Sequence, residues 1–163
     1  MQDFFLKHFN PTIRENLIAN QIKIIDLCVK NNIPLITLEY KAGGALRGKT
    51  TSQLQKEITK IHHREIIIKN SNSGFTNTGL DSILQTLKIT DLLIMGINAN
   101  GCVQDTAIGA LRKGYTVITS QGIIASSSRR DLSLSKRNKY WYKEHTLFFE
   151  TVPELLSHIS RQY

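Results

Sequence analysis

Short apolar runs alternate with helix-like segments along most of this chain, and no other feature constrains its fold as strongly. The runs cover Leu35–Tyr40, Glu65–Lys69, Asp91–Ile97, Tyr115–Ser120 and Leu147–Glu150. They are nearly continuous in apolar residues, as is typical of parallel strands that are covered on both faces. The pattern therefore predicts an α/β domain of three layers (α/β/α, Rossmann-like), with helices on both faces of a mostly parallel sheet.

The segments between the runs carry helical periodicity. Helices are expected over Thr12–Asn31, Leu54–Ile61, Leu80–Leu87, Cys102–Lys113 and Pro153–Arg161. We expect Thr12 to cap the first helix, with Glu15 closing a capping box. No strand is apparent before Thr12, although a domain of this kind normally begins with one. We therefore expect a single domain over residues 1–163 that lacks its first strand, either in the protein or in this record of it.

Length and composition exclude several classes of protein. A chain of 163 residues with 40% hydrophobic and 21% charged residues suits one globular domain rather than a disordered chain. No apolar run reaches the roughly 18 residues of a membrane span, and the N-terminus lacks the regions of a signal peptide. Two cysteines are too few for a disulfide framework, so we expect a cytoplasmic protein with no membrane partner.

The formal net charge of +8 permits a nucleic-acid or anionic partner. The positive charge is spread along the chain and is densest in Arg129–Lys143, where basic residues are mixed with tyrosines and a tryptophan. Such a mixture can stack on bases, but it is also the ordinary composition of a solvated loop and helix face. We favour the second interpretation and expect no nucleic-acid partner.

The most reactive side chain in the sequence is expected at Cys102. It follows the apolar run Asp91–Ile97 and a short Gly/Asn loop, and it begins a predicted helix, where the unpaired N–H groups favour a thiolate. Lys69 ends another predicted strand, so both side chains are expected at the carboxyl edge of the sheet, in one crevice. From spacing alone, Cys102 could equally be a small buried residue and Lys69 a surface charge.

Three segments resemble motifs of one known family. Gly96–Ala107 (GINANGCVQDTA) closely resembles the nucleophile segment of the isochorismatase-like cysteine hydrolases. Upstream, Ile66–Lys69 with Gly74-Phe75 and Thr78–Leu80 is similar to the family's catalytic-lysine strand and the loop after it. Met1–Phe5 is similar to the tail of its first motif. The resemblance covers most of the chain, and the cysteine segment is its most specific part.

The resemblance implies hydrolysis of a C–N bond in a small amide, without a cofactor. Cys102 would be the nucleophile, and Lys69 would stabilise the thiolate and the developing charge. The backbone N–H groups of Asn98 and Cys102 would form the oxyanion hole, shaped by a cis peptide bond between Ile97 and Asn98. Family members commonly assemble, so a homo-oligomer acting on a small-molecule substrate is expected.

The sequence departs from the family pattern at two points. The family's catalytic aspartate directly precedes the residue aligned with Met1, and Asp3 lies too far along to replace it. Either the first strand and its aspartate are missing from this record, which we favour, or the chain is a pseudo-hydrolase that binds a small molecule or a partner. The histidines that bind a metal in related nicotinamidases are also absent after the second strand, and His62-His63 do not have ligand spacing, so no metal is expected.

A competing enzyme class is suggested by Gly43–Thr50, which matches the phosphate-loop pattern G-x-x-x-x-G-K-[ST] in full. The match follows a predicted strand and precedes a possible helix, as such a loop requires. However, no later apolar strand ends in an aspartate that could hold Mg²⁺. A P-loop nucleotide hydrolase therefore stays as the weaker alternative.

Overall fold

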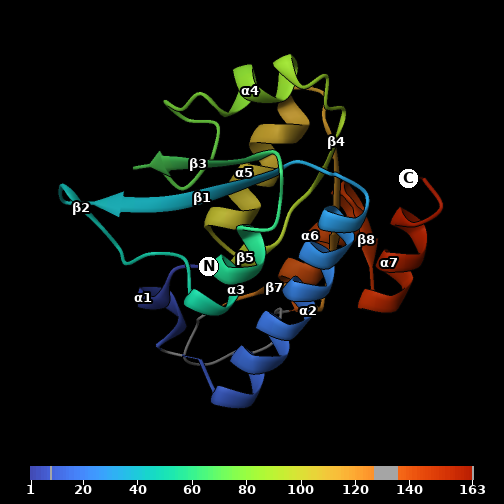
Figure 1. Ribbon diagram of the computed structural model, residues 1–163, viewed down its shortest axis with the longest axis horizontal. Helices are drawn as coiled ribbons and strands as arrows, with labels where there is room; N and C mark the ends of the chain where they lie inside the picture. The colour runs from blue at the N-terminus through green and yellow to red at the C-terminus, as the bar shows by residue number, and fades with distance from the viewer. Residues whose placement is uncertain (8, 127–135, 163) are drawn as a thin grey trace.

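Parallel strands form the centre of the molecule and helices lie on both sides of them (Figure 1). The computed structural model describes residues 1–7, 9–126 and 136–162. The helices are α1 (Asp3–Leu6), α2 (Pro11–Lys30), α3 (Ser52–Ile58), α4 (Leu80–Thr86), α5 (Cys102–Arg112), α6 (Lys136–His145) and α7 (Val152–Ile159). The strands are β1 (Leu35–Ala42), β2 (Ala45–Leu46), β3 (Arg64–Lys69), β4 (Asp91–Leu93), β5 (Gly96–Ile97), β6 (Thr116–Ser120), β7 (Ile124–Ala125) and β8 (Leu147–Phe149). The predicted α/β fold, Rossmann-like with three layers, is confirmed.

The described strands form three separate sheets rather than one continuous sheet. β1 pairs in parallel with β3, β4 and β8 both pair in parallel with β6, and β5 pairs in parallel with β7. Within the described residues, no ladder joins β1 to β4. Each of these two strands is therefore paired in parallel along one side only.

Two apolar clusters place the helices on opposite faces of the strands. On one face, Ile25 of α2 and Leu54 of α3 pack with Leu35 of β1. On the other, α4 and α5 supply Leu84 and Ala107, which pack against half-buried residues of β1, β3 and β4. In Figure 1, α5 passes behind the β1–β3 pair. β1 therefore meets helices on both faces, as its near-continuous hydrophobicity predicted. At β3 the expected cover is incomplete, because Ile66 and Ile68 are 53% and 45% exposed.

The first long helix begins one residue earlier than expected, and its predicted cap is wrong. Asn10, not Thr12, is the N-cap, and its side chain accepts a hydrogen bond from the Thr12 N–H at 3.0 Å. Pro11 takes the first helical position, where its fixed φ and missing N–H cost nothing. For this reason α2 lacks the capping box predicted with Glu15. A capping box is present at the N-terminus of α7, between Thr151 and Glu154.

The Gly43–Thr50 segment forms a β-hairpin and not a phosphate-binding loop. Gly43 and Gly44 have φ of +59° and +82° and make the turn between β1 and the antiparallel β2. The Thr50 hydroxyl, which would face Mg²⁺ in a phosphate loop, donates to the buried Glu39 carboxylate at 2.8 Å. The sequence match is therefore not accompanied by the geometry that phosphate binding requires.

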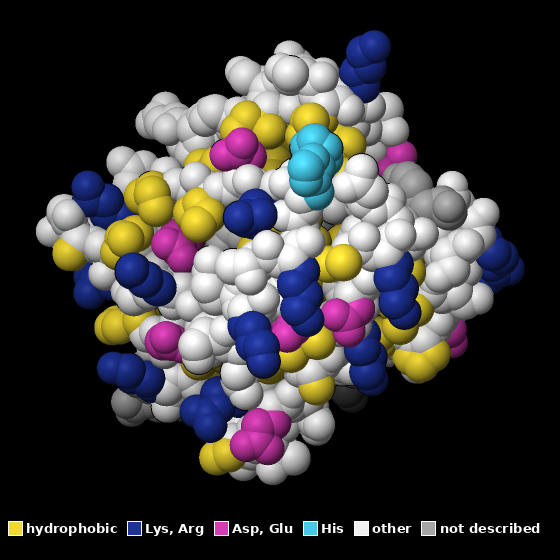
Figure 2. All heavy atoms as spheres, viewed as in Figure 1, with side chains coloured by type: hydrophobic (Ala, Val, Ile, Leu, Met, Phe, Trp, Pro, Cys, Tyr) yellow, Lys and Arg dark blue, Asp and Glu magenta, His cyan; other side chains and the backbone are white. Residues whose placement is uncertain are grey.

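The basic aromatic segment packs against the domain in the part that can be described. Residues 127–135 lie outside the described residues, whereas α6 follows them. Tyr142 of α6 is only 1% exposed and Trp141 packs against the same core, while Lys139 and Lys143 both pair with Glu150. On the face seen in Figure 2, Lys and Arg side chains are dispersed among acidic ones. No helix of the described ranges is long and apolar enough to cross a membrane.

Candidate active site

Lys69 ends β3 and is held inside the molecule. Its register partner in β1 is Tyr40, whose ring centroid lies 5.1 Å from the Lys69 Nζ atom. The ammonium donates to the main-chain oxygens of Ser71 and Asn72, at 2.7 and 2.6 Å, because the loop after β3 folds back over it. Lys69 is only 5% exposed, so the reading of this residue as a surface charge is wrong.

The Lys69 ammonium lies near the Cys102 thiol, and the charges of the two groups influence each other. Burial lowers the pKa of Lys69 below its ordinary value. A charge interaction and a hydrogen bond with the Cys102 side chain, and the charge of Asp105, act in the opposite direction. A lysine whose pKa is lowered releases its proton more readily than a solvated one. The Lys69 Nζ atom and the Cys102 Sγ atom both contact Asn72, so the two side chains lie near each other at one edge of the strands. Their catalytic roles stay a prediction.

Cys102 is the first residue of α5 and is half-buried. The loop before it contains the cis peptide bond between Ile97 and Asn98, as the resemblance implied. The Asn98 carbonyl accepts from the N–H groups of Gly101 and Val103, at 3.0 and 3.1 Å, which closes the loop into a tight turn. Cys102 thus begins the helix, where the first backbone N–H groups have no partner within the helix itself, and it lies close to the Asn98 backbone.

The loop is also held from outside. The Ala99 N–H donates to the Ala125 carbonyl at 2.9 Å, and the Ala99 carbonyl accepts from the Tyr142 hydroxyl at 2.7 Å. Burial raises the pKa of Tyr142, so the hydroxyl stays a donor at all ordinary pH values. Two elements distant in sequence, β7 and α6, therefore fix the backbone that precedes the thiol.

A cavity of about 610 Å³ opens beside this site. The loop after β3 and one side of α5 line it, through Ser71, Asn72, Ser73, Phe75, Thr76, Asp105, Ile108, Gly109, Arg112 and Lys113. Neither Cys102 nor Lys69 is among these residues. Asn72 joins the cavity to the thiol, because the Cys102 Sγ atom lies 3.7 Å from its Oδ1 atom. The volume suits a small organic molecule.

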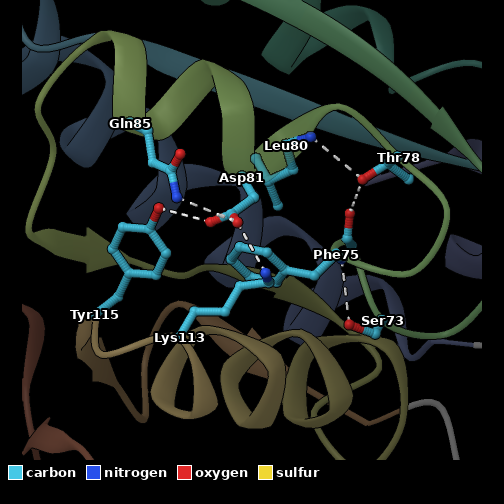
Figure 3. Close-up of polar contacts among 9 residues, drawn as sticks. Ser73, Phe75, Thr78, Leu80, Asp81, Gln85, Lys113 and Tyr115 are labelled. Atoms are coloured by element: carbon cyan, nitrogen blue, oxygen red, sulfur yellow. Dashed lines mark hydrogen bonds and ion pairs between the residues drawn. The ribbon is translucent and has the colours of Figure 1, made fainter.

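The far end of the cavity is braced by a polar network at the start of α4 (Figure 3). Asp81 accepts from the Lys113 ammonium and the Tyr115 hydroxyl, both at 2.8 Å. These two hydrogen bonds hold the pKa of the Asp81 carboxyl below its ordinary value. Figure 3 also shows Thr78 bonded within the loop that carries Phe75. Asp81 thus holds the side chain of Lys113, a residue that lines the cavity.

Three contributors to the site were not found from sequence. Asn72 is one polar residue among several in its loop, and Tyr142 lies in a segment interpreted as solvated. Gln2 was read only as part of a motif, yet its carboxamide bonds to the backbone of Tyr40, beside Lys69. The motif was the signal for Gln2, whereas no sequence pattern marked the other two.

No metal site accompanies these residues. Across residues 1–7, 9–126 and 136–162, no group of three or more His, Cys, Asp or Glu side chains is placed to hold a metal ion. The rings of His62 and His63 contact each other edge to face, with centroids 4.5 Å apart and an interplanar angle of 80°, and both residues are exposed. The other cysteine, Cys28, packs in the core, and burial raises its pKa to about 11.

Comparison with known proteins places this arrangement in a family. Residues 1–138 match the Isochorismatase domain. The chain belongs to the isochorismatase family. The isochorismatase family protein YaaI of Bacillus subtilis is 26% identical over an alignment of 129 residues, and the match covers 72% of this chain and 70% of YaaI. Nicotinamidase 3 of Arabidopsis thaliana is 24% identical over 136 residues, covering 73% of this chain and 68% of that enzyme.

Solved structures of isochorismatase family proteins share the fold. The nicotinamidase SaPncA from Staphylococcus aureus superposes with a TM-score of 0.74 at 19% sequence identity, over 85% of this chain and 88% of that one. The family thus includes hydrolases of amides, and the domain described above has their architecture. The matched range contains Lys69, Asn98 and Cys102.

Proposed function

We propose that this isochorismatase family protein is a hydrolase that cleaves the C–N bond of a small amide, with Cys102 as its nucleophile. One observation carries the proposal: the buried Lys69 ammonium and the Cys102 thiol at the start of a helix both contact Asn72, at the carboxyl edge of parallel strands. Such an arrangement favours a reactive thiolate, and the adjoining cavity has the size of a small ligand.

The reaction would proceed in two stages. The Cys102 sulfur attacks the carbonyl carbon of the amide, and the electron pair of the C=O bond moves to oxygen. When the tetrahedral adduct collapses, the C–N bond breaks and the nitrogen leaves with a proton as ammonia or an amine. Water then attacks the thioester carbon, which releases a carboxylic acid and restores the thiol.

Lys69 would favour the thiolate and supply positive charge beside the developing oxyanion. Its lowered pKa suits a group that also moves a proton between sulfur and the leaving nitrogen. The backbone N–H groups of Asn98 and Cys102 would donate to the oxyanion, a contribution that is worth about 10²–10³-fold in enzymes that use such donors.

The third acid–base group of the family, an aspartate, is an open part of the proposal. In the part of the chain that the structure describes, no carboxylate forms an ion pair with Lys69. The expectation from the family resemblance, that a further strand ends in this aspartate, is compatible with the lack of a ladder between β1 and β4 in the described residues. The lack of a carboxylate partner for Lys69 among the described residues also favours the second candidate, a pseudo-hydrolase whose pocket binds a small molecule without turnover.

Ammonia release from a panel of small primary amides tests the proposal. The described chain is compared with a longer chain translated from further upstream, and each is compared with Cys102→Ala and Lys69→Met. Hydrolysis that disappears in Cys102→Ala supports the cysteine hydrolase, and about 10²–10⁴-fold more activity in the longer chain supports the added strand and aspartate. Binding of an amide without release by either chain supports the pseudo-hydrolase and contradicts the hydrolase. Cys28→Ser is the matched control and should retain activity.

We also propose a cytoplasmic location and a homo-oligomeric assembly. Both cysteines are free thiols, which suits a reducing compartment. Fractionation of the source cells and sedimentation of the purified protein test the two statements. Recovery of the protein outside the cytoplasm would contradict the proposed location. Sedimentation as a monomer at micromolar concentration would contradict the proposed homo-oligomer.

A further inference from the structure

Asn72 contacts both reactive side chains through different atoms. Its main-chain oxygen accepts from the Lys69 Nζ atom at 2.6 Å. Its side-chain Oδ1 atom lies 3.7 Å from the Cys102 Sγ atom, with the thiol as donor. The side chain also lines the 610 Å³ cavity, so Asn72 stands between the thiol and the space where a ligand fits.

Tight packing between the loop and α5 determines where Asn72 lies. The Gly74 N–H donates to the Thr106 hydroxyl at 2.9 Å, one helical turn beyond Cys102. A Cβ atom at Gly74 would lie 3.1 Å from the Thr106 Cγ2 atom, and one at Gly109 would lie 2.9 Å from the Ser73 Oγ atom. The loop therefore approaches α5 more closely than side chains at either glycine would allow. Asn72 is exposed, yet its backbone has little freedom to move away.

We propose that Asn72 is a positioning residue for Cys102: its carboxamide oxygen accepts the S–H hydrogen and holds the sulfur at the rim of the cavity. This role rests on the proposed function, since Asn72 would orient the nucleophile toward the substrate. The test does not require turnover, because the Cys102 thiol can be alkylated without a substrate.

The charge state of the residue at position 72 gives a distinctive signature. An oxygen that accepts from the neutral thiol stabilises the protonated form, so its removal should favour the thiolate. A carboxylate at the same place adds a negative charge near the sulfur and should disfavour the thiolate. Alanine and aspartate should therefore move the ionisation of Cys102 in opposite directions, whereas general disruption of the loop would have no reason to do so.

The experiment measures the rate at which iodoacetamide modifies Cys102, by peptide mass spectrometry, in the full chain from pH 5 to 10. Asn72→Asp should raise the pH of half-maximal rate by about one unit, the lower end of the effect of a close like charge. Asn72→Ala should lower that pH by a few tenths. Asn70→Asp is the matched control, since Asn70 is also exposed, lies two residues away and gains the same charge. It should shift the profile by less than a third as much as Asn72→Asp.

Equal shifts in Asn72→Asp and Asn70→Asp would overturn the proposal, and so would a rise in the midpoint for Asn72→Ala. If one variant does not fold, the other still decides, because each has its own expected direction. The outcome is independent of the amide assay. Opposite shifts without hydrolysis would reject the hydrolase and support the contact between Asn72 and Cys102. Hydrolysis without the shifts would support the hydrolase and reject that contact.

Discussion

The Gln2 carboxamide is hydrogen-bonded to both backbone groups of Tyr40. Its Oε1 atom accepts from the Tyr40 N–H at 2.7 Å, and its Nε2 atom donates to the Tyr40 carbonyl at 3.0 Å and to the Gly48 carbonyl at 2.7 Å. The side chain thus takes the place of a neighbouring peptide group on the side of β1 that does not face β3. Since Tyr40 is the register partner of Lys69, this contact supports the strand pair that carries the ammonium.

Replacing Gln2 with leucine should destabilise the fold. Gln2 is 4% exposed, and its loss leaves the Tyr40 N–H and the Gly48 carbonyl without this partner, whereas the Tyr40 carbonyl still accepts from the Arg47 N–H at 3.0 Å. We expect the free energy of unfolding to fall by about 2 kcal/mol, the usual cost of unsatisfied buried polar groups. Urea denaturation measures the change. Gln53→Leu, at an exposed position of α3, is the control and should stay within about 0.5 kcal/mol of the wild type; similar losses in both variants would refute the role of the contact.

Tyr142→Phe should weaken the loop before the nucleophile. The substitution removes the donor to the Ala99 carbonyl and leaves that oxygen buried, so we expect a loss of about 1–2 kcal/mol. Thermal unfolding and the alkylation rate of Cys102 would both report the change. Tyr140→Phe is the matched control, because Tyr140 is 66% exposed in the same helix. An unchanged Tyr142→Phe protein would mean that α6 does not hold the loop.

The network at Asp81 should make stability depend on pH in the acidic range. The folded state lowers the pKa of Asp81 through hydrogen bonds from Lys113 and Tyr115, so the unfolded state binds its proton first as pH falls. The contribution is complete above the unfolded value of about 3.9 and is lost as pH falls through the lower folded value. Comparing the unfolding midpoints of wild type and Asp81→Asn from pH 7 to 2 should give a difference that narrows below about pH 4. The exposed Asp26→Asn should give no such trend, and a constant gap for Asp81→Asn would contradict the assignment.

The hairpin at Gly43–Thr50 should not bind nucleotide phosphates. Its glycines form a turn between antiparallel strands, and the Thr50 hydroxyl is engaged by Glu39. Millimolar Mg-ATP is expected to leave the thermal unfolding midpoint of the wild type and of Lys49→Ala unchanged and equal. A rise that Lys49→Ala abolishes would restore the P-loop interpretation.

The sequence was informative where the signal was a local pattern. The loop before Cys102 and the helix start could be placed because turn residues and helix periodicity each mark the chain directly. The single strand predicted over Asp91–Ile97 is wrong, because the run is divided into β4 and β5, which belong to different sheets. Lys69 could be placed beside Cys102 because carboxyl ends of parallel strands share an edge. The phosphate-loop match failed for the opposite reason: eight residues do not specify whether their glycines turn a hairpin or surround an anion.

The remaining features depend on contacts between distant segments. Tyr142 is buried only because α6 returns to the loop at Ala99, more than forty residues earlier in the chain. The position of Asn72 depends on the close approach of its loop to Gly109 and Thr106. No sequence pattern around Asn72 predicts that approach. The first cap was misplaced by two residues because both Asn10 and Thr12 are good capping residues, and Pro11 decides between them.

The pairing of Lys69 with Cys102 is the central claim, and the pH profile of Cys102 alkylation in Lys69→Met tests it most directly. Methionine keeps the length and apolar stem of lysine but removes the charge, and Lys23→Met, at an exposed position of α2, controls for the change of net charge. We expect Lys69→Met to raise the pH of half-maximal alkylation by at least about one unit, because the thiolate loses its adjacent cation, and Lys23→Met to leave it unchanged. A profile for Lys69→Met that coincides with the wild type would contradict the account.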